Sequence, residues 1–425
     1  MKRVLELPSL VLFGLAFMSP LAVFVTYGAV QQVTHTHISS AYIITLIAII
    51  FTAISYGRMS RVVPNSGSAY AYATKSFGTQ LGFLVGWALL LDYLLAPMLC
   101  YLVLSIYMHD YFPEIAKNYW IFAAAIVMFV LNVLGIKLVS KINLALVACQ
   151  LLFVAAFLVL SIIVLMHTKA EIDFLQPFYD PKVKLSMLIS GSAILCLSFL
   201  GFESISTLSE EAEKPESTIP KAIILCVLLS GALYTLTAYM GQLVVPHWPQ
   251  NTDPDTMGLK LISFVGGENF KASFVGMSLI GCLATAMAAI ASVSRVLYSM
   301  GGNGAIPTIF GRLHKKYETP VVAIAIVSII SLLSMFMSLT LASNMISFGA
   351  LVAFTFVNLA VFKYFFIDQM NRNLVSNLLL PLIGFGLTIW LWTSLSSTAI
   401  IVGASWLAVG LVYLMLKPQQ LKMEI

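Results

Sequence analysis

Long apolar runs constrain the fold of this chain more than any other feature. Each run is close to the roughly 20 residues that an α-helix needs to cross the hydrocarbon of a bilayer. The loops between the runs are too short to form a soluble domain. We therefore predict an all-α polytopic membrane protein. Its twelve expected transmembrane helices cover residues 10–31, 41–63, 81–108, 120–136, 142–166, 185–206, 222–245, 273–300, 321–339, 346–366, 378–395 and 399–416.

The composition excludes a water-soluble globule. Hydrophobic residues make up 60% of the 425 residues and charged residues 10%, whereas a soluble domain averages about 25% charged residues. The net charge of +5 is scattered among short loops, so it predicts no nucleic-acid partner. All five cysteines lie inside apolar runs, and we expect no extracellular disulfide. We expect most aromatic side chains to face lipid or the membrane interface.

The basic residues orient the chain in the bilayer. With the N-terminus in the cytoplasm, 17 of the 23 lysines and arginines fall on the inside and 6 on the outside. The positive-inside rule therefore predicts two cytoplasmic termini. We expect the protein in the cytoplasmic (inner) membrane. Arg295 and Lys363 are placed toward cytoplasmic helix ends, where their side chains can snorkel. The start Met1–Lys2–Arg3 precedes a long run without a small-residue cleavage site, and we expect no cleaved signal peptide.

Two of the expected spans are interrupted. In the first, Gly14 and Pro20 flank Phe17, and in the sixth, Gly201 lies beside Glu203. Proline lacks an N–H group and glycine weakens a helix, so both interruptions favour broken helices. Corresponding interruptions in two halves of a membrane protein point to a transporter site. A simple kink is the alternative for either span alone, because glycine and proline are common in membrane helices.

Two carboxylates stand out inside the apolar runs. Of 18 acidic residues, only Asp92 and Glu203 lie well within a run. A carboxylate at this depth costs on the order of 3 kcal/mol on insertion scales, so it normally faces a cavity and has a function. The pair predicts a site that favours cations or exchanges protons, although each acid can instead be protonated and hydrogen-bonded structurally. The acidic run after span 6 is expected to be a solvated loop that makes salt bridges, with contact to substrate at the inner mouth as the alternative. It contains Glu210, Glu211, Glu213 and Glu216.

Signatures of catalysis are missing from the sequence. We find no phosphate-binding Gly-rich loop ending in Lys-Ser or Lys-Thr, no His-Glu-x-x-His pair and no Gly-x-Ser-x-Gly elbow. We therefore expect neither an enzyme nor a metal or organic cofactor. Energy for transport would come from an ion gradient or from exchange.

Four motifs resemble the amino acid–polyamine–organocation superfamily of permeases. They are PNSGSAYAYATKSFG, SFLGFESISTLSEEAEKPESTIPKAI, SRVLYSMGGNGAIPTIFGRLHKKYETP and ISFGALVAFTFVNLAVF, and they are spread over most of the chain. The resemblance implies a five-plus-five inverted repeat with solute held between spans 1, 3, 6, 8 and 10. It divides the chain into repeats at 1–168 and 185–370 and a C-terminal helix pair at 376–416.

Within this superfamily the chain is most similar to the putrescine importers, through FMSPLAVF, DPDTMGLKLISFVGG and GALVAFTFVNL. Many amino acid permeases instead carry Gly-Ser-Gly at the first break, which exposes N–H groups to a carboxylate. The chain differs from some relatives at two places. Arginine/agmatine-type relatives stack substrate on a Trp in span 8, whereas the region Val275 to Leu297 here has no aromatic residue. Some proton-coupled relatives have a lysine in span 5, where this chain has Cys149 and Gln150. Sodium remains open as coupling ion through Ser292 and Ser294.

These observations lead to one preferred function, a secondary-active importer of putrescine or a related polyamine, coupled to protons rather than sodium. The alternatives are an amino acid permease of the same fold, a channel or receptor without turnover, and, more remotely, a membrane enzyme. The oligomeric state stays open. Glu203 and Asp92 are the predicted proton carriers. The predicted substrate contacts are Met18, Ser19, Ala22, Asp92, Tyr93, Phe199, Gly201, Phe202, Glu203, Ser347 and Gly349.

Overall fold

Helices make up most of the protein. The computed structural model describes residues 3–168, 172–178, 183–249, 252, 254–337, 339–395 and 397–416. The first helices are α1 (Leu7–Met18), α2 (Ala22–Thr34), α3 (Ile38–Val62), α4 (Ala69–Phe77), α5 (Thr79–Tyr111), α6 (Lys117–Leu134) and α7 (Ile136–His167). They are followed by α8 (Leu185–Leu195), the 3-10 helices η1 (Cys196–Phe199) and η2 (Phe202–Glu211), and α9 (Pro215–Val244).

The last part of the chain is also helical. It contains α10 (Pro254–Gly302), the 3-10 helix η3 (Thr308–Gly311), α11 (Val321–Ser331), the 3-10 helix η4 (Leu332–Phe336), α12 (Leu339–Val361), the π-helices η5 (Phe362–Asp368) and η6 (Val375–Leu379), α13 (Leu380–Trp392) and α14 (Ser397–Leu416).

The described helices confirm a multi-pass membrane protein. Ten of them, counted within the described ranges, are long and apolar enough to cross a bilayer. The pair α1 and α2 meets the same criterion as one span bent by 46°. The apolar unit Val321–Phe336 is shorter than these. The coarse prediction of an all-α polytopic protein is therefore confirmed.

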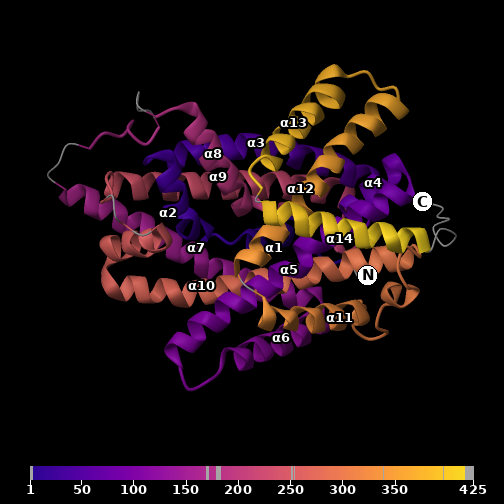
Figure 1. Ribbon diagram of the computed structural model, residues 1–425, viewed down its shortest axis with the longest axis horizontal. Coiled ribbons are helices and arrows are strands. Elements are labelled where there is room, and N and C mark those ends of the chain that lie inside the picture. The colour runs from indigo at the N-terminus through magenta and orange to yellow at the C-terminus, as the bar shows by residue number, and fades with distance from the viewer. Residues whose placement is uncertain are drawn as a thin grey trace.

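Helix α5 lies at the centre of this arrangement. It packs against both α10 and α12, while α3 packs against α9 and α10 against α7. The most apolar window of α5 is 83% buried, compared with 17% for α14. In Figure 1 the long helices run roughly side by side, and α14 ends at the same edge as α4. Asp92 thus lies on the most enclosed of the ten described spans.

Helix α10 begins earlier than the run expected at 273–300. It starts at Pro254 and turns sharply at Gly267, whose φ is 75°. Its first segment packs closely on α2, because a Cβ atom at Gly28 would lie 1.9 Å from the Pro254 carbonyl oxygen. The sequence did not reveal this segment because polar residues and glycines interrupt its apolar character.

The expectation that most aromatic residues face lipid or the membrane interface is wrong for eight of the 17 tyrosines. An aromatic ring has a large apolar surface, and these rings pack on other aromatic rings inside the protein, as Tyr42 does on Tyr234 and Tyr56 on Tyr72. Eight tyrosines are among its largest fully buried side chains, namely Tyr27, Tyr42, Tyr56, Tyr70, Tyr72, Tyr93, Tyr101 and Tyr234.

The acidic run after span 6 is likewise not a solvated loop throughout. Glu211 is buried, and its carboxylate accepts hydrogen bonds from Arg295 Nε at 2.5 Å and Nη2 at 3.0 Å. Arg295 also donates to the Ala291 carbonyl, so it does not snorkel as predicted. The backbone N–H groups of Val4 and Leu5 bind the Glu211 carbonyl oxygen. The predicted salt bridge exists, but in the interior.

Candidate functional site

The break in span 1 lies where the sequence places it. Helix α1 ends at Met18, Ser19 adopts φ 56° and ψ 113°, and α2 begins at Ala22. Pro20 has no N–H group to continue the helix. The Ala22 N–H instead donates to the Ser19 carbonyl at 3.1 Å. The chain therefore changes direction within three residues.

Neighbouring helices supply polar partners for the break. Thr285 of α10 donates its hydroxyl toward the carbonyl oxygens of Ala16 and Phe17, at 3.0 and 3.2 Å. The Ser19 hydroxyl donates to Gln150 Oε1 of α7 at 2.9 Å. Unwound backbone is tolerated in a membrane only where its polar groups find such partners.

The break in span 6 is built around Gly201. Its φ of 121° is a backbone conformation that glycine adopts readily and other residues rarely. A Cβ atom at this position would lie 2.5 Å from Phe17 Cδ1, so the two breaks are in contact. The Gly201 N–H points at the Glu203 carboxylate, 3.0 Å from Oε2 and 3.2 Å from Oε1. Glu203 thereby binds the unwound backbone of its own span.

A cavity of about 410 Å³ opens beside the first break. On α5 its lining runs from Asp92 to Val103, which corresponds to about 16 Å of helix. Its polar lining residues are Ser19, Thr26, Asp92, Ser198, Ser278 and Thr285. Its other lining residues are Phe17, Met18, Leu21, Ala22, Val25, Ala96, Leu99, Cys100, Val103, Leu197, Leu200, Gly281, Cys282 and Ile346.

Asp92 is the one acid among the described residues that line this cavity. The side chain is fully buried, and neither carboxylate oxygen has a hydrogen-bond partner among the described residues. A buried carboxylate without a partner is strongly unfavourable. The cavity therefore offers an unsatisfied acceptor of positive charge or of a proton.

The predicted contacts divide between this cavity and its surroundings. Four of them line it, namely Met18, Ser19, Ala22 and Asp92. Gly349 is not among its lining residues. A Cβ atom at Gly349 would lie 2.6 Å from the Ala88 carbonyl and 2.9 Å from the Asp92 nitrogen, so this glycine lets α12 pack closely on α5 at the level of the carboxylate.

The predicted aromatic contacts lie in packed clusters. Tyr93 packs on Phe17 with ring centroids 5.8 Å apart. Phe199 lies 5.6 Å from Tyr234, and Phe202 lies 5.3 Å from Phe354. None of the three predicted aromatic residues is among the residues that line the cavity. Gly201 and Glu203 also lie outside its lining.

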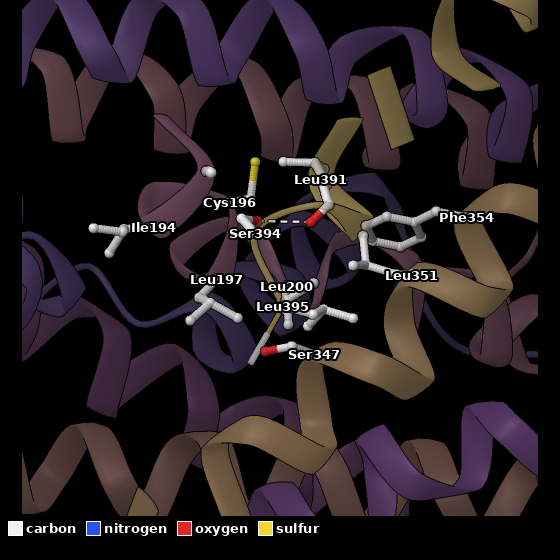
Figure 2. A pocket seen from close by; sticks show the side chains of 11 residues that line it. Ile194, Cys196, Leu197, Leu200, Ser347, Leu351, Phe354, Leu391, Ser394 and Leu395 are labelled. Atoms are coloured by element: carbon white, nitrogen blue, oxygen red, sulfur yellow. Dashed lines mark hydrogen bonds between the residues drawn. The ribbon is translucent and has the colours of Figure 1, made fainter. Parts of the chain in front are cut away.

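Ser347 lines a second cavity, of about 160 Å³, on the other side of the span 6 break. Figure 2 shows Leu197, Leu200 and Leu395 converging above Ser347, while Ser394 donates to the Leu391 carbonyl at 2.6 Å. Leu197 and Leu200 line both cavities and separate them. The second cavity has no charged side chain among its lining residues.

Sequence reasoning missed the hydroxyl groups of the first cavity. Thr26, Ser198, Ser278 and Thr285 were not predicted as contacts. Isolated serines and threonines are common in membrane helices because they can bind the carbonyl four residues earlier, so they give little signal. Tyr234 was also missed. Its hydroxyl lies between the two breaks, 3.1 Å from the Met18 carbonyl and 3.3 Å from the Ser198 carbonyl.

A broken first span, a broken sixth span and a cavity between them are features of transporters. The sequence profile of the family described as "Amino acid permease" matches residues 9–421. The chain belongs to this family. It is therefore a multi-pass membrane transporter and not an enzyme.

Curated transport proteins resemble the chain over most of its length. The low-affinity putrescine importer PlaP of Escherichia coli K12 is 39% identical over 424 residues, covering 97% of this chain and 93% of the importer. The branched-chain amino acid permease BcaP of Bacillus subtilis is 25% identical and covers 85% of this chain and 80% of the permease. Mouse cationic amino acid transporter 4 is 26% identical, covering 84% of this chain and 59% of the transporter.

Proposed function

We propose that this permease imports putrescine or a related polyamine across the cytoplasmic membrane. The observation that carries the proposal is Asp92, a buried carboxylate on the wall of the 410 Å³ cavity that has no hydrogen-bond partner among the described residues. The two carboxylate oxygens of Asp92 have neither a positive charge nor an N–H donor beside them among the described residues, and an ammonium group would supply both. The 39% identity to a putrescine importer over 97% of the chain supports the same class of substrate.

The first break supports a cation over a carboxylate. A carboxylate is bound at such a break by free backbone N–H groups. Here Pro20 has no N–H group, and the Ala22 N–H is already bonded to the Ser19 carbonyl. The break therefore offers an α-carboxylate fewer free backbone N–H groups than a Gly-Ser-Gly break would.

The second ammonium of a diamine would be held differently from the first. Glu203, one of the predicted substrate contacts, accepts a hydrogen bond from the Gly201 N–H and lies outside the cavity lining. We assign this role to hydroxyl and carbonyl oxygens, with Ser198 and Ser278 as candidates on the cavity wall. A neutral oxygen binds an ammonium more weakly than a carboxylate does. One strong and one weak contact would favour modest rather than tight binding.

We assign the coupled proton to Glu203 and the substrate ammonium to Asp92. Protonating Glu203 would weaken its hold on the Gly201 N–H and so loosen the span 6 break. Glu203→Gln should therefore abolish concentrative uptake and leave substrate binding and counterflow intact. A variant that still concentrates substrate would contradict this assignment. Sodium is the competing ion, with buried Ser292 and Ser294 in α10 as candidate ligands.

The proposal includes a topology. It has twelve spans, an inverted repeat formed by residues 1–168 and 185–370, a C-terminal pair at 376–416 and two cytoplasmic termini. Alternating access would exchange the cavity between the two sides. The distribution of 17 basic residues inside and 6 outside supports the orientation.

Reconstituted protein tests the function. Liposomes with an imposed proton gradient should accumulate labelled putrescine, and a protonophore should abolish the accumulation. Cadaverine and spermidine should compete, whereas zwitterionic amino acids should not. Competition by zwitterions alone would establish the second candidate, an amino acid permease, which the similarity to the branched-chain permease favours. Lack of trans-stimulation in counterflow would overturn both in favour of a channel.

A further inference from the structure

The Tyr234 hydroxyl lies where both broken spans meet. It is 3.1 Å from the Met18 carbonyl and 3.0 Å from the Ser19 carbonyl in span 1, and 3.3 Å from the Ser198 carbonyl in span 6. A tyrosine hydroxyl has one proton to donate. Three carbonyl oxygens from two spans therefore share a single donor.

The face of α9 that carries Tyr234 packs along the C-terminal end of α1. Cys226, Ser230 and Tyr234 are spaced four residues apart, so they lie on one face of the helix. The Cys226 thiol and the Ser230 hydroxyl each lie 3.6 Å from Met18 Sδ. The residue before the break is thus held along two turns of α9.

Aromatic neighbours fix the Tyr234 ring. Its centroid lies 5.4 Å from that of Tyr42 in α3 and 5.6 Å from that of Phe199 in η1. The ring is fully enclosed, with a relative exposure of 1%. Packing on both sides holds the hydroxyl in place, so a shift of either break changes which carbonyl it meets best.

Thr285 provides an internal comparison. Its hydroxyl also donates to carbonyl oxygens of the first break, those of Ala16 and Phe17, but it makes no hydrogen bond with span 6 among the described residues. Thr285 therefore stabilises one break alone. Tyr234 is placed to connect the two.

We propose that Tyr234 is a positioning residue that ties the two broken spans together and transfers its hydrogen bond between the carbonyls of Ser19 and Ser198 as the breaks shift during transport. The role in transport rests on the proposed function; the tie between the breaks does not. The ring does not contact the substrate in this scheme, because Tyr234 is not among the residues that line the cavity.

Hydrogen–deuterium exchange of the purified protein tests the tie without transport. Tyr234→Phe keeps the ring and removes the hydroxyl, and it should increase exchange both at 16–22 and at 196–203. Thr285→Val should increase exchange at 16–22 only. Tyr239→Phe is the matched control, because Tyr239 lies on the same helix and binds the exposed Phe174 carbonyl. An increase confined to one break in Tyr234→Phe, or to neither, would overturn the proposal.

Transport kinetics test the consequence. With whichever substrate the wild type takes up, Tyr234→Phe should lower Vmax by about threefold to tenfold, the usual effect of one hydrogen bond, and should leave KM within about twofold. A parallel rise in KM, or an unchanged Vmax, would contradict the role in transport. A wild type that transports nothing in the panel would refute the proposed function, and the exchange experiment would still decide whether Tyr234 joins the breaks.

Discussion

Replacing Asp92 with asparagine separates a binding role from a structural one. The amide has nearly the same shape as the carboxylate but carries no charge. In the structure neither carboxylate oxygen makes a hydrogen bond with a described residue, so the substitution breaks no bond within the described protein. Any loss of function must then come from the missing charge toward a ligand.

The size of the effect follows from the bond that the charge would make. A hydrogen bond to a charged group contributes about 1.5–3 kcal/mol, and each 1.4 kcal/mol is about a tenfold change in a binding constant. We therefore expect Asp92→Asn to raise the Kd for putrescine by about tenfold to a hundredfold. A second ammonium contact to neutral oxygens would be unaffected.

Although Asp92→Asn should weaken substrate binding, it should not lower the stability of the ligand-free protein. A carboxylate near the centre of a membrane helix costs on the order of 3 kcal/mol, and the amide removes that charge. The melting temperature of the detergent-purified, ligand-free variant should equal or exceed that of the wild type. The wild type should gain more melting temperature than the variant when putrescine is added.

Two measurements decide the matter, titration calorimetry for Kd and a thermal melt with and without ligand. Glu203→Gln is the matched control, since it removes the other membrane carboxylate and should leave Kd unchanged. An unchanged Kd in Asp92→Asn would refute the binding role. A lower melting temperature in the ligand-free variant would show that Asp92 is a structural residue whose partner lies outside the described contacts.

Two further predictions concern the packing that holds the site. Glu211→Gln breaks the buried pair with Arg295, and removing one partner of such a pair typically costs about 3–5 kcal/mol. The melting temperature of this variant should therefore fall clearly, whereas Glu213→Gln, at an exposed position, should melt like the wild type. Gly201→Ala places a Cβ atom 2.5 Å from the Phe17 ring at a φ of 121°, so we expect loss of folded protein on size-exclusion chromatography; a monodisperse, active variant would disprove that packing.

The helices and the first break could be predicted because their causes are local. An apolar run determines a membrane helix wherever it lies in the fold, and Pro20 interrupts the hydrogen bonds of its own helix. The segment from Pro254 to Gly266 could not be predicted in the same way. It is helical because it packs on α2, with Pro254 against Gly28, and that contact joins residues more than two hundred positions apart.

The candidate site could be predicted only in part, for the same reason. Asp92 was found because an acid in an apolar run is rare. Neighbouring positions could not be assigned, since Tyr93 turns onto Phe17 while Asp92 faces the cavity. Ser347 was placed in the main site, yet Ile346 lines that cavity and Ser347 lines the second one. A change of one residue rotates a side chain by about 100° around a helix.

The two membrane acids carry the same sequence signal and differ only in what surrounds them. Glu203 meets the N–H group that the Gly201 turn leaves unpaired, so the break and the carboxylate satisfy each other. Asp92 lies on a continuous helix, where no backbone N–H is left free, and it meets none. The unfavourable free energy of burying Asp92 must therefore be offset by something that the described chain does not supply. A proton can do so at any site, but the cavity of about 410 Å³ beside Asp92 leaves room for an organic cation as well. This combination of an acid without a described partner and adjacent space is the reason why we propose Asp92, and not Glu203, as the substrate-binding acid.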